Sequence, residues 1–504
     1  MTTTIDMRTT TNRHCTIFAG LLLAFASITL LSSCGGKPSH ATQVNAQPKI
    51  FPDYAGTTIP VDIAPLDFSA VGRDAEAMYV VVKGSKSGEM EAGGDYADFD
   101  VDEWHRLTET NKGGKLVFTV YIKRGGEWKQ YRDFTVNVSS DPLGEWGLTY
   151  RLIPPGYEVY GKMGLYQRNL SNFDEQAILV NTAVPGACLN CHTSNRTSPE
   201  QFTFHIRGAN GGTLISQHGR VEILKAKNDS LKGSMVYPYW HPSGQWVAYS
   251  TNQTHQSFHA VRSERIEVFD QASDVLIYHP ATHQIVLNPA VMTKDHYENY
   301  PVFSPDGRTL YFVSSTAWDI PAHYKNIKYN ICRVGFDPKT GRTVGKVDTI
   351  FNARQMGKSA NHPRPSYDGR FLLFTLSDYG CFPIWHKEAD QWLLDLRTMS
   401  ARPLTEINSE NTDSWHNWSR NSHWIVFTSR RINGYYTQLY LAHVDSRGRM
   451  GKPFLLPQRN PWLYYDRQLN SYNTPDFTLQ PVRLNAHKAA GNILSSERVA
   501  TEIK

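Results

Sequence analysis

Only one run of this sequence is long and apolar, and basic residues do not cluster anywhere in it. The apolar run, Ile17 to Leu31, is shorter than the roughly 20 residues that a transmembrane helix needs, and no later run is long enough to span a bilayer. The net charge of +5 is small for 504 residues. The sequence therefore predicts neither an integral membrane body nor a nucleic-acid-binding protein.

The common catalytic motifs are also missing. There is no Gly-x-Ser-x-Gly elbow of an α/β-hydrolase, and the nearest segment, Gly357 to Asn361, lacks the last glycine. There is no glycine-rich phosphate loop and no His-Glu-x-x-His zinc helix. Scattered groups such as His296, Asp306 and Asp368 are better explained by roles in turns and strands. Nothing in the sequence indicates a hydrolase or a nucleotide-dependent enzyme.

The N-terminus carries an export signal. Arg8 and Arg13 precede the apolar run, and Leu31-Ser32-Ser33-Cys34 follows it. This last segment resembles the lipobox of bacterial lipoproteins, which implies cleavage before Cys34 and acylation of its thiol. The alternative is an ordinary signal peptide that leaves Cys34 free. We expect a signal peptide at 1–33, a flexible tether at 34–48, and a bacterial cell-envelope lipoprotein held to the membrane by its N-terminal lipid. No acidic run follows Cys34, which favours the periplasmic face over the cell surface.

Residues 49–184 read as short strands separated by turns. Met78 to Lys83 is rich in β-branched residues, and Lys115 to Lys123 alternates toward a Gly125-Gly126 turn. Trp128 to Val138 returns from that turn with matching alternation, which is typical of a β-hairpin. A β-sandwich-like domain is the simplest prediction for this region.

Beyond residue 200 the chain repeats a turn followed by an apolar, aromatic strand. The four copies are 240–250, 303–313, 365–375 and 418–428. The last of the four turn residues is a glycine at 244, 307 and 369, and Ser422 in the last copy. Proline sets φ, aspartate caps the turn, and glycine takes the positive φ that reverses the strand. One such unit cannot bury both faces of its sheet, so several must stack.

The repeat resembles that of TolB-like, WD40-like β-propellers, whose Ser-Pro-Asp-Gly turn is intact at Ser304 to Gly307. The resemblance implies an all-β protein in which each repeat forms a four-stranded blade. We expect a propeller of five or six blades over 185–480, followed by a C-terminal tail at 481–504. Thr203 to Ile215, with its Asn-Gly-Gly turn, is assigned to a first, atypical blade. The alternative is an array of β-sandwiches with chance Asp-Gly turns.

At the predicted start of the propeller stands a Cys-x-x-Cys-His motif, formed by Cys188, Cys191 and His192. Two thiols at this spacing can add across the vinyl groups of haem, and the adjacent imidazole can then ligate the iron. The motif predicts one covalent haem c with His192 as the proximal ligand. His205 is the first candidate for the distal ligand, followed by Met163 and His218.

Two other interpretations of the cysteine pair stay open. Cys188 and Cys191 can form a disulfide, or they can bind zinc together with His192, although no fourth ligand stands at a standard spacing. Cys332 and Cys381 complete the four thiols that remain after removal of the signal and lipidation of Cys34. They are either a second disulfide or buried thiols.

Two functions follow from these interpretations. The first is a lipid-anchored extracytoplasmic haem c protein with a redox partner, in which electron transfer is favoured over catalysis. The second is a non-enzymatic propeller scaffold that binds an envelope protein or a cell-envelope polymer, with Cys188 and Cys191 joined as a disulfide. The two differ in whether haem is attached.

Overall fold

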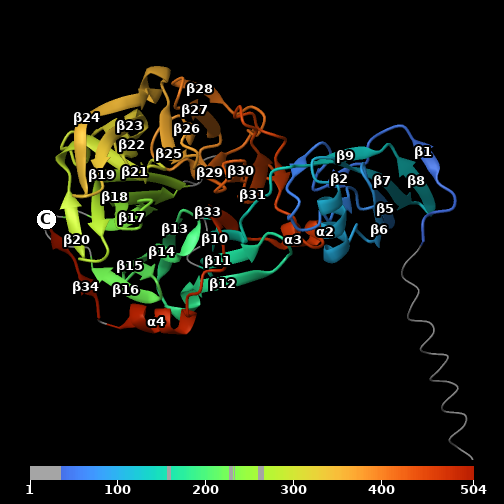
Figure 1. Ribbon diagram of the computed structural model, residues 1–504, viewed down its shortest axis with the longest axis horizontal. Coiled ribbons are helices and arrows are strands. Elements are labelled where there is room, and N and C mark those ends of the chain that lie inside the picture. Colours follow the sequence, from blue (N-terminus) through green and yellow to red (C-terminus); the bar gives the residue numbers. More distant parts are fainter. Residues whose placement is uncertain (1–35, 156–160, 226–230, 232, 259–265, 496) are drawn as a thin grey trace, which may run out of the picture.

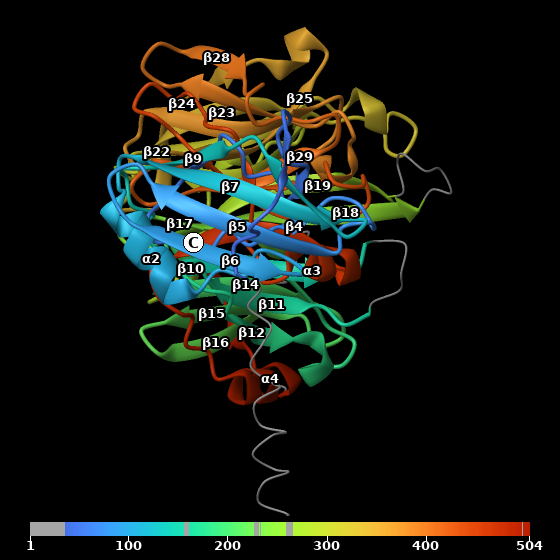
Figure 2. The same ribbon diagram turned by 90° about the vertical axis from the view of Figure 1, so that its right-hand side faces the viewer.

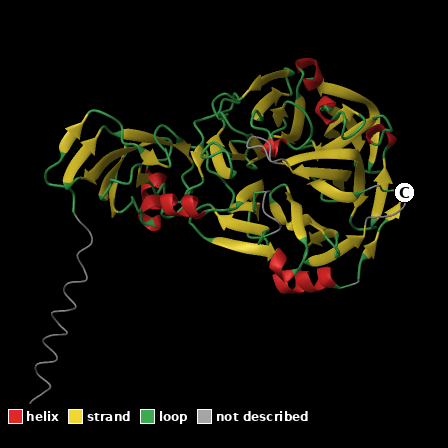
Figure 3. Ribbon diagram, turned by 180° about the vertical axis from the view of Figure 1, so that it is seen from behind, coloured by secondary structure: helices red, strands yellow, loops and turns green. Residues whose placement is uncertain are grey.

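The computed structural model describes residues 36–155, 161–225, 231, 233–258, 266–495 and 497–504. Strands make up most of a small N-terminal domain and a larger β-propeller beside it, with the helices at the junction and at the outer edge (Figures 1 and 3). The predicted signal segment and Cys34, the predicted site of lipidation, lie outside the described residues. Within the described residues, no helix combines the length and the apolar character needed to cross a membrane.

The N-terminal domain contains nine strands and one helix. Its elements are β1 (Thr42–Val44), β2 (Ile50–Phe51), β3 (Thr58–Ile59), β4 (Ser69–Ala70), β5 (Ala77–Gly84), β6 (Glu89–Gly94), α2 (Val101–Thr110), β7 (Lys115–Arg124), β8 (Glu127–Tyr131) and β9 (Phe134–Val138). The predicted hairpin is present as β7 and β8, with Gly125 and Gly126 at φ values of 58° and 81°. Positive φ at both central residues matches the twist of the flanking strands.

A single seven-stranded sheet dominates this domain, in place of the two packed sheets of a sandwich. Its main path is β1-β8-β7-β5-β6, and β9 joins β7 to β3, while β2 and β4 form only a small separate pair. One face is covered by apolar side chains of α2, such as Trp104, and of residues 59–68. The expected tether is partly ordered, because β1 pairs in parallel with β8.

Six sheets of four principal strands form the propeller, and we number the blades in chain order. Blade 1 holds β10 (Gly147–Ile153), β11 (Gly164–Asn169), β12 (Glu175–Val180) and β33 (Ser471–Thr478). Blade 2 holds β13 (Cys188–Asn195), β14 (Ser198–Arg207), β15 (Gly212–Gln217) and β16 (Arg220–Lys225). Blade 3 holds β17 (Ser234–Trp240), β18 (Val247–Phe258), β19 (Ile266–His279) and β20 (Gln284–Leu287).

The other three blades follow without interruption. Blade 4 holds β21 (His296–Phe303), β22 (Thr309–Thr316), β23 (Asn330–Asp337) and β24 (Arg342–Phe351). Blade 5 holds β25 (Ser359–Pro365), β26 (Phe371–Ser377), β27 (Asp390–Asp395) and β28 (Ser400–Pro403). Blade 6 holds β29 (Asp413–Trp418), β30 (Trp424–Ser429), β31 (Gln438–His443) and β32 (Phe454–Leu455). The predicted count of five or six blades is therefore confirmed as six.

The repeated turns join the innermost strand of a blade to the second strand, as their sequence predicts. Gly244, Gly307 and Gly369 have φ values of 72°, 70° and 75°, and Ser422 has 62° in the fourth copy. In the intact copy the Asp306 carboxylate accepts hydrogen bonds from the Ser304 hydroxyl at 2.5 Å and the Arg308 N–H at 3.1 Å. Such bonds join residues of the turn itself and require no tertiary contact.

The ring is closed by a strand from the other end of the chain. β33 pairs with β10 as the innermost strand of blade 1, and it contacts β29 of blade 6 and β13 of blade 2. Residues 147–180 therefore belong to the propeller, so the boundary between the two parts lies near residue 140 instead of at residue 184. The expected tail at 481–504 also joins the propeller, because β34 (Val499–Ala500) and β35 (Glu502–Ile503) extend blades 2 and 3. Helix α4 (Ala486–Leu494) packs on blades 1 and 2.

The N-terminal domain and the propeller share one apolar core. Residues of the N-terminal sheet, such as Phe118 and Val138, belong to the same buried cluster as Trp424 and Leu441 of blade 6 and Tyr472 of β33. Helix α3 (Pro461–Arg467) lies at the junction, where Trp462 and Tyr465 contact Phe51 edge to face. Figure 2 shows the N-terminal sheet against this side of the propeller. A shared core of this kind holds the two parts as one body.

Candidate functional site

Every innermost strand carries a β-bulge at the same level of the propeller. The strand register shifts there in all six blades. One non-glycine residue in each bulge has left-handed backbone geometry: Cys191, Tyr237, Tyr300, His362, Trp415 and Thr474. A bulge redirects a side chain out of the regular alternation of a strand. The six bulges therefore aim six side chains at the axis.

The sequence around each bulge explains how the strained backbone is held. The preceding residue is asparagine in four blades, and in three of them its Oδ1 accepts a hydrogen bond from the left-handed residue's N–H, at 2.9 Å for Asn190, 2.9 Å for Asn299 and 3.1 Å for Asn473. The following residue is proline in four blades and histidine in the other two, at His192 and His416. Proline suits a bulge because the ladder loses one hydrogen bond there in any case.

Aromatic rings fill the axis at this level. The ring centroids of Tyr300 lie 4.4 Å from Tyr237 and 4.1 Å from His362, and His362 lies 3.9 Å from Trp415. Both ring nitrogens of His362 lack a hydrogen-bond partner among the described residues, and burial lowers its pKa well below the usual value. His362 is therefore a neutral ring that packs among its aromatic neighbours. We call Tyr237, Tyr300, His362 and Trp415 the aromatic plug of the axis, and refer to it below as the plug.

A polar mouth opens on the turn side of this plug. We define the axial mouth as Thr193, Arg196, Tyr239, Arg364, Tyr367, Asn417 and Asp476, which line two adjoining cavities. The guanidinium carbon of Arg364 lies 5.4 Å from the Tyr239 ring centroid, and that of Arg196 lies 5.9 Å from the Tyr367 ring centroid. Stacking on aromatic rings holds both arginines in place without neutralising their charge.

Asp476 is the buried carboxylate of the axial mouth. Its Oδ1 accepts from Asn417 at 2.7 Å, and its Oδ2 accepts from Thr193 Oγ1 and Ser194 N–H at 3.3 Å each. Burial raises its pKa to about 6, although these hydrogen bonds and Arg364 oppose that rise. Near neutral pH the axial mouth thus contains two positively charged arginines and one carboxylate whose pKa is raised. The Arg196 Nε and Ser194 Oγ atoms have no hydrogen-bond partner among the described residues.

The cavities behind the axial mouth are small. Their volumes are ≈ 20 and ≈ 30 Å³, room for about one or two water molecules each. Pockets that enclose an organic ligand usually measure about 300 Å³ or more. A ligand of the axial mouth must therefore present a small anionic group from outside.

The structure places the predicted haem-attachment motif in β13, the innermost strand of blade 2. The half-buried Cys188 thiol lies 3.0 Å from the Arg151 guanidinium, which also lies 3.7 Å from Met163 Sδ. Cys191 is buried at the axis against the backbone of Tyr237, and burial raises its pKa. The four described cysteines, including Cys332 and Cys381, are all free thiols, so the structure contains neither of the two disulfides that the sequence left open as alternatives.

The two predicted iron ligands contact different threonines. His192 Nε2 lies 3.0 Å from Thr149 Oγ1 of blade 1, and its Nδ1 lies 3.5 Å from Thr474 Oγ1 of β33. His205 Nδ1 lies 3.4 Å from Thr213 Oγ1, which bonds to the backbone of blade 3. Burial lowers the pKa of His192 to about 4 and that of His205 to about 3. The further candidate His218 is exposed in the turn after β15.

As folded, these residues do not fit a haem. The cavity beside Cys191 and His192 measures ≈ 30 Å³, and both His192 nitrogens face threonine hydroxyls. Nor do Cys188, Cys191 and His192 gather as metal ligands. Among the described residues, the group of three with ligand atoms close enough lies elsewhere, at the junction of the two parts of the protein.

The polar and charged residues of the axial mouth were not identified in the sequence analysis. Thr193, Tyr239, Arg364, Asn417 and Asp476 each stand two positions after the left-handed residue of a bulge. Aligning the Asn-x-Pro triplets upstream of the turns, as in Asn299 to Pro301 and Asn361 to Pro363, reveals this shared position. The same alignment shows Asn190-Cys191-His192 to be a further copy.

No protein-family model matches the sequence, and no curated protein sequence matches it. Solved structures give distant likenesses. TolB from Acinetobacter baumannii is 12% identical with a TM-score of 0.43, over 76% of this chain and 86% of that chain. Prolyl oligopeptidase B from Galerina marginata is 10% identical with a TM-score of 0.34, over 73% of this chain and 52% of that chain. A DUF4784 family protein from Bacteroides caccae is 6% identical with a TM-score of 0.31, over 71% and 95%.

Proposed function

We propose that this protein is a binding scaffold of the bacterial cell envelope, whose propeller recognises an acidic segment of a partner protein at the axial mouth. The export signal and the lipobox-like Leu31 to Cys34 support a membrane-anchored position outside the cytoplasm. The all-β body offers rigid loops and turns around one mouth, an arrangement suited to docking a partner.

The observation that carries the proposal is the unbalanced charge of the axial mouth. Arg196 and Arg364 face one carboxylate, that of Asp476, whose pKa is about 6. Arg196 Nε has no protein partner among the described residues. A carboxylate from outside would satisfy this donor and balance the second arginine. Because the cavities hold only one or two waters, that carboxylate must project from a larger chain.

Catalysis is disfavoured by the partners of the axial histidines. His192 contacts two threonines, His416 Nε2 lies 3.1 Å from the Leu373 carbonyl, and His362 packs between rings. None of these three rings is oriented by a carboxylate, as the imidazole of a Ser-His-Asp triad is. Burial also lowers the pKa of His416 to about 3.

A peptide-binding measurement tests the proposal. A fluorescent glutamate-rich peptide with an amidated C-terminus should raise its anisotropy on titration with the purified protein, whereas the glutamine analogue should not. Arg364→Gln should weaken binding about tenfold or more, because a charge-assisted hydrogen bond contributes about 1.5–3 kcal/mol. Arg333→Gln is the control, since Arg333 pairs with Asp348 on the outside of blade 4.

Equal binding of both peptides, or an unchanged affinity of Arg364→Gln, would refute the carboxylate site. Asp476→Asn provides a change of opposite sign. It removes the only mouth carboxylate and should tighten the acidic peptide. Stronger binding of a uronic-acid polysaccharide than of any acidic peptide would contradict the choice of a protein partner.

Haem-dependent electron transfer is the second candidate, and the order Cys188-x-x-Cys191-His192 behind an export signal is what favours it. This function requires residues 188–192 to leave β13, because the cavity beside them is too small for a porphyrin. Absorption spectra and intact mass of the protein, purified from cells that mature c-type cytochromes, test whether haem is attached. A Soret band and the added mass of one haem would establish attachment, and an unmodified mass would exclude it.

A further inference from the structure

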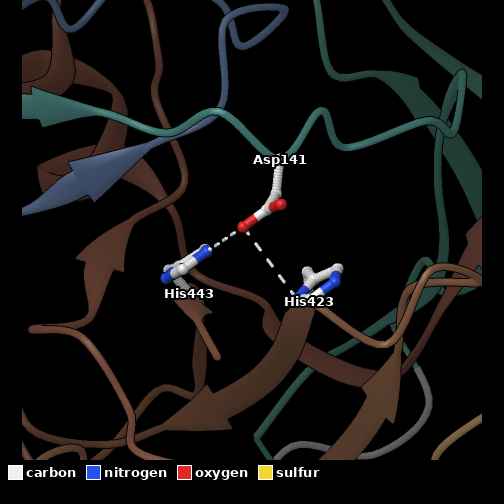
Figure 4. A group of neighbouring side chains, drawn as sticks. All are labelled: Asp141, His423 and His443. Atoms are coloured by element: carbon white, nitrogen blue, oxygen red, sulfur yellow. Dashed lines mark hydrogen bonds and ion pairs between the residues drawn. The ribbon is translucent and has the colours of Figure 1, made fainter. Parts of the chain in front are cut away.

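Asp141, His423 and His443 gather at the junction between the N-terminal domain and blade 6 (Figure 4). Asp141 Oδ2 lies 2.9 Å from His443 Nε2 and 3.9 Å from His423 Nδ1. One ligand atom from each residue lies within 4.8 Å of the others. In a tetrahedral zinc site, neighbouring ligand atoms are about 3.4 Å apart. The observed separations bracket that value, so small side-chain rotations suffice to bind an ion.

The three side chains come from two parts of the protein. Asp141 stands in the connection between β9 and β10, which leads from the N-terminal domain into the propeller. His423 immediately precedes β30, and His443 is the last residue of β31, so both belong to blade 6. An ion bound by all three would join the connection to blade 6.

Side chains of blade 6 already hold the backbone of the connection in place. Trp424 Nε1 donates to the carbonyls of Asp141 at 3.3 Å and Pro142 at 3.2 Å, and Asn421 Nδ2 donates to Pro142 O at 2.6 Å. The Trp424 ring also packs edge to face on His443, with centroids 4.9 Å apart. Contacts with the buried Trp424 therefore position the cluster together with the 2.9 Å contact between Asp141 and His443.

The charges and geometry of the cluster favour a cation. The ion-pair partners of Asp141 among the described residues are the two histidines, and no lysine or arginine pairs with it. The two imidazole rings are nearly parallel, at 12°, with centroids 6.4 Å apart, and Figure 4 shows the Asp141 carboxylate between them. All three side chains are partly exposed, with accessibilities of 34%, 36% and 18% for Asp141, His423 and His443. Solvent and ions can therefore reach the ligand atoms.

We propose that Asp141, His423 and His443 form a binding site for a divalent transition metal of the zinc class, which links the N-terminal domain to blade 6. Two imidazoles and one carboxylate suit zinc, whereas calcium and magnesium prefer sets of oxygen ligands. Water completes the coordination on the exposed side. On binding, His423 Nδ1 exchanges its 3.2 Å contact with the Val444 carbonyl for the ion.

Calorimetric titration of the untagged, full-length protein with Zn²⁺ tests this site. We expect one equivalent to bind and the thermal midpoint to rise, and neither effect with Mg²⁺ or Ca²⁺. His423→Ala and Asp141→Asn should each weaken binding at least tenfold and remove the rise in midpoint. His423→Ala is the more informative variant, because His423 is the most exposed of the three ligands. Co²⁺ should give the visible absorption of a tetrahedral site in the wild type and not in His423→Ala.

Two control variants separate this site from other zinc ligands. Cys188→Ser removes the one partly accessible described thiol of the Cys-x-x-Cys-His motif, and His296→Ala removes an exposed histidine of β21. Both should bind zinc as the wild type does. Absence of zinc binding, binding that survives His423→Ala, or binding lost in Cys188→Ser would each overturn the proposal. None of these outcomes depends on the axial mouth.

Discussion

Cys191 in β13 and Tyr300 in β21 occupy equivalent positions in two blades. Each is the left-handed residue of its bulge with a φ of 49°, and each N–H donates to the Oδ1 of the preceding asparagine at 2.9 Å. Cys191-His192 is thus a copy of the unit that reads Tyr300-Pro301 two blades away. A structural role in the repeat accounts for two of the three residues that define the predicted haem motif.

Removal of the asparagine before a bulge should destabilise the propeller. Asn190→Ala deprives the buried Cys191 N–H of its acceptor and Arg151 Nη1 of a partner at 3.2 Å. We expect the free energy of unfolding to fall by about 1–3 kcal/mol, as for other buried hydrogen bonds that are lost on one side. Urea denaturation followed by tryptophan fluorescence measures it. Asn45→Ala, an exposed position, should leave the midpoint unchanged.

The described thiols should differ sharply in reactivity. Cys188 is half buried, whereas Cys191, Cys332 and Cys381 are buried, and burial raises the pKa of Cys332 to about 11. Because the thiolate is the reactive form, a thiol reagent should modify only Cys188 among these four thiols in the folded protein, and all four on unfolding. Mass spectrometry of modified peptides is the measurement. Loss of the fast phase in Cys188→Ser is expected, and a native protein with no reactive thiol would argue for a disulfide or for thioether bonds.

Acid should weaken the fold through His192. Its pKa is about 4 in the folded protein against 6.5 in the unfolded chain, because burial disfavours the charged ring. Above pH 6.5 both states are neutral. Between pH 6.5 and 4 the unfolded chain binds the extra proton, so stability falls by about 1.4 kcal/mol for each unit of decreasing pH.

Denaturation midpoints at several pH values measure this slope. His192→Gln keeps a polar partner for Thr149 and should reduce the slope between pH 6.5 and 4 by about 1.4 kcal/mol per pH unit, leaving the part that comes from the buried His205 and His416. His296→Gln, at an exposed position, should reproduce the wild-type slope. A slope that is the same in all three proteins would show that His192 is not the titrating group.

Alkaline pH should weaken the ion pairs that His386 makes with two glutamates. Burial disfavours the His386 imidazolium, but its contacts with Glu267 at 3.7 Å and Glu388 at 3.1 Å outweigh that effect and raise its pKa to about 9. The stabilisation is complete below pH 6.5 and is lost as the pH rises through 9, because the unfolded chain releases its proton first. In Glu388→Gln the decline between pH 6.5 and 9 should be smaller. Equal declines in both proteins would contradict this assignment.

The sequence contained enough to predict the propeller, because its turns are local. Ser304 to Gly307 forms the expected turn from hydrogen bonds among its own residues, and a strand must follow it. Blade 1 could not be predicted from the sequence because of its topology. Its innermost strand β33 and second strand β10 are not consecutive, so no turn joins them and no Asp-Gly signal marks the blade. The sequence pattern therefore does not separate residues 147–180 from the preceding domain.

The site was harder to predict than the fold. Arg196, Arg364 and Asp476 come from different blades, and only ring closure brings them to one mouth. The Cys-x-x-Cys-His order by itself predicts haem attachment, because a motif carries no information about the residues that pack around it in the fold. Its environment in β13, with His192 held by Thr149 and Thr474, depends on contacts from both ends of the chain.

Closure by β33 also constrains how the chain can fold. Thr149 and Asp476 bond across this seam although they are 327 residues apart in sequence. The first propeller strands to emerge during synthesis or export must wait, with one edge unpaired, until the last ones arrive. Bringing the two ends of so long a segment together lowers the conformational entropy of the chain before the contacts between β33 and β10 can form. We therefore expect a slow final step of folding. During that interval the open edge of β10 is available to other strands, so this seam is where a chaperone would have most to protect.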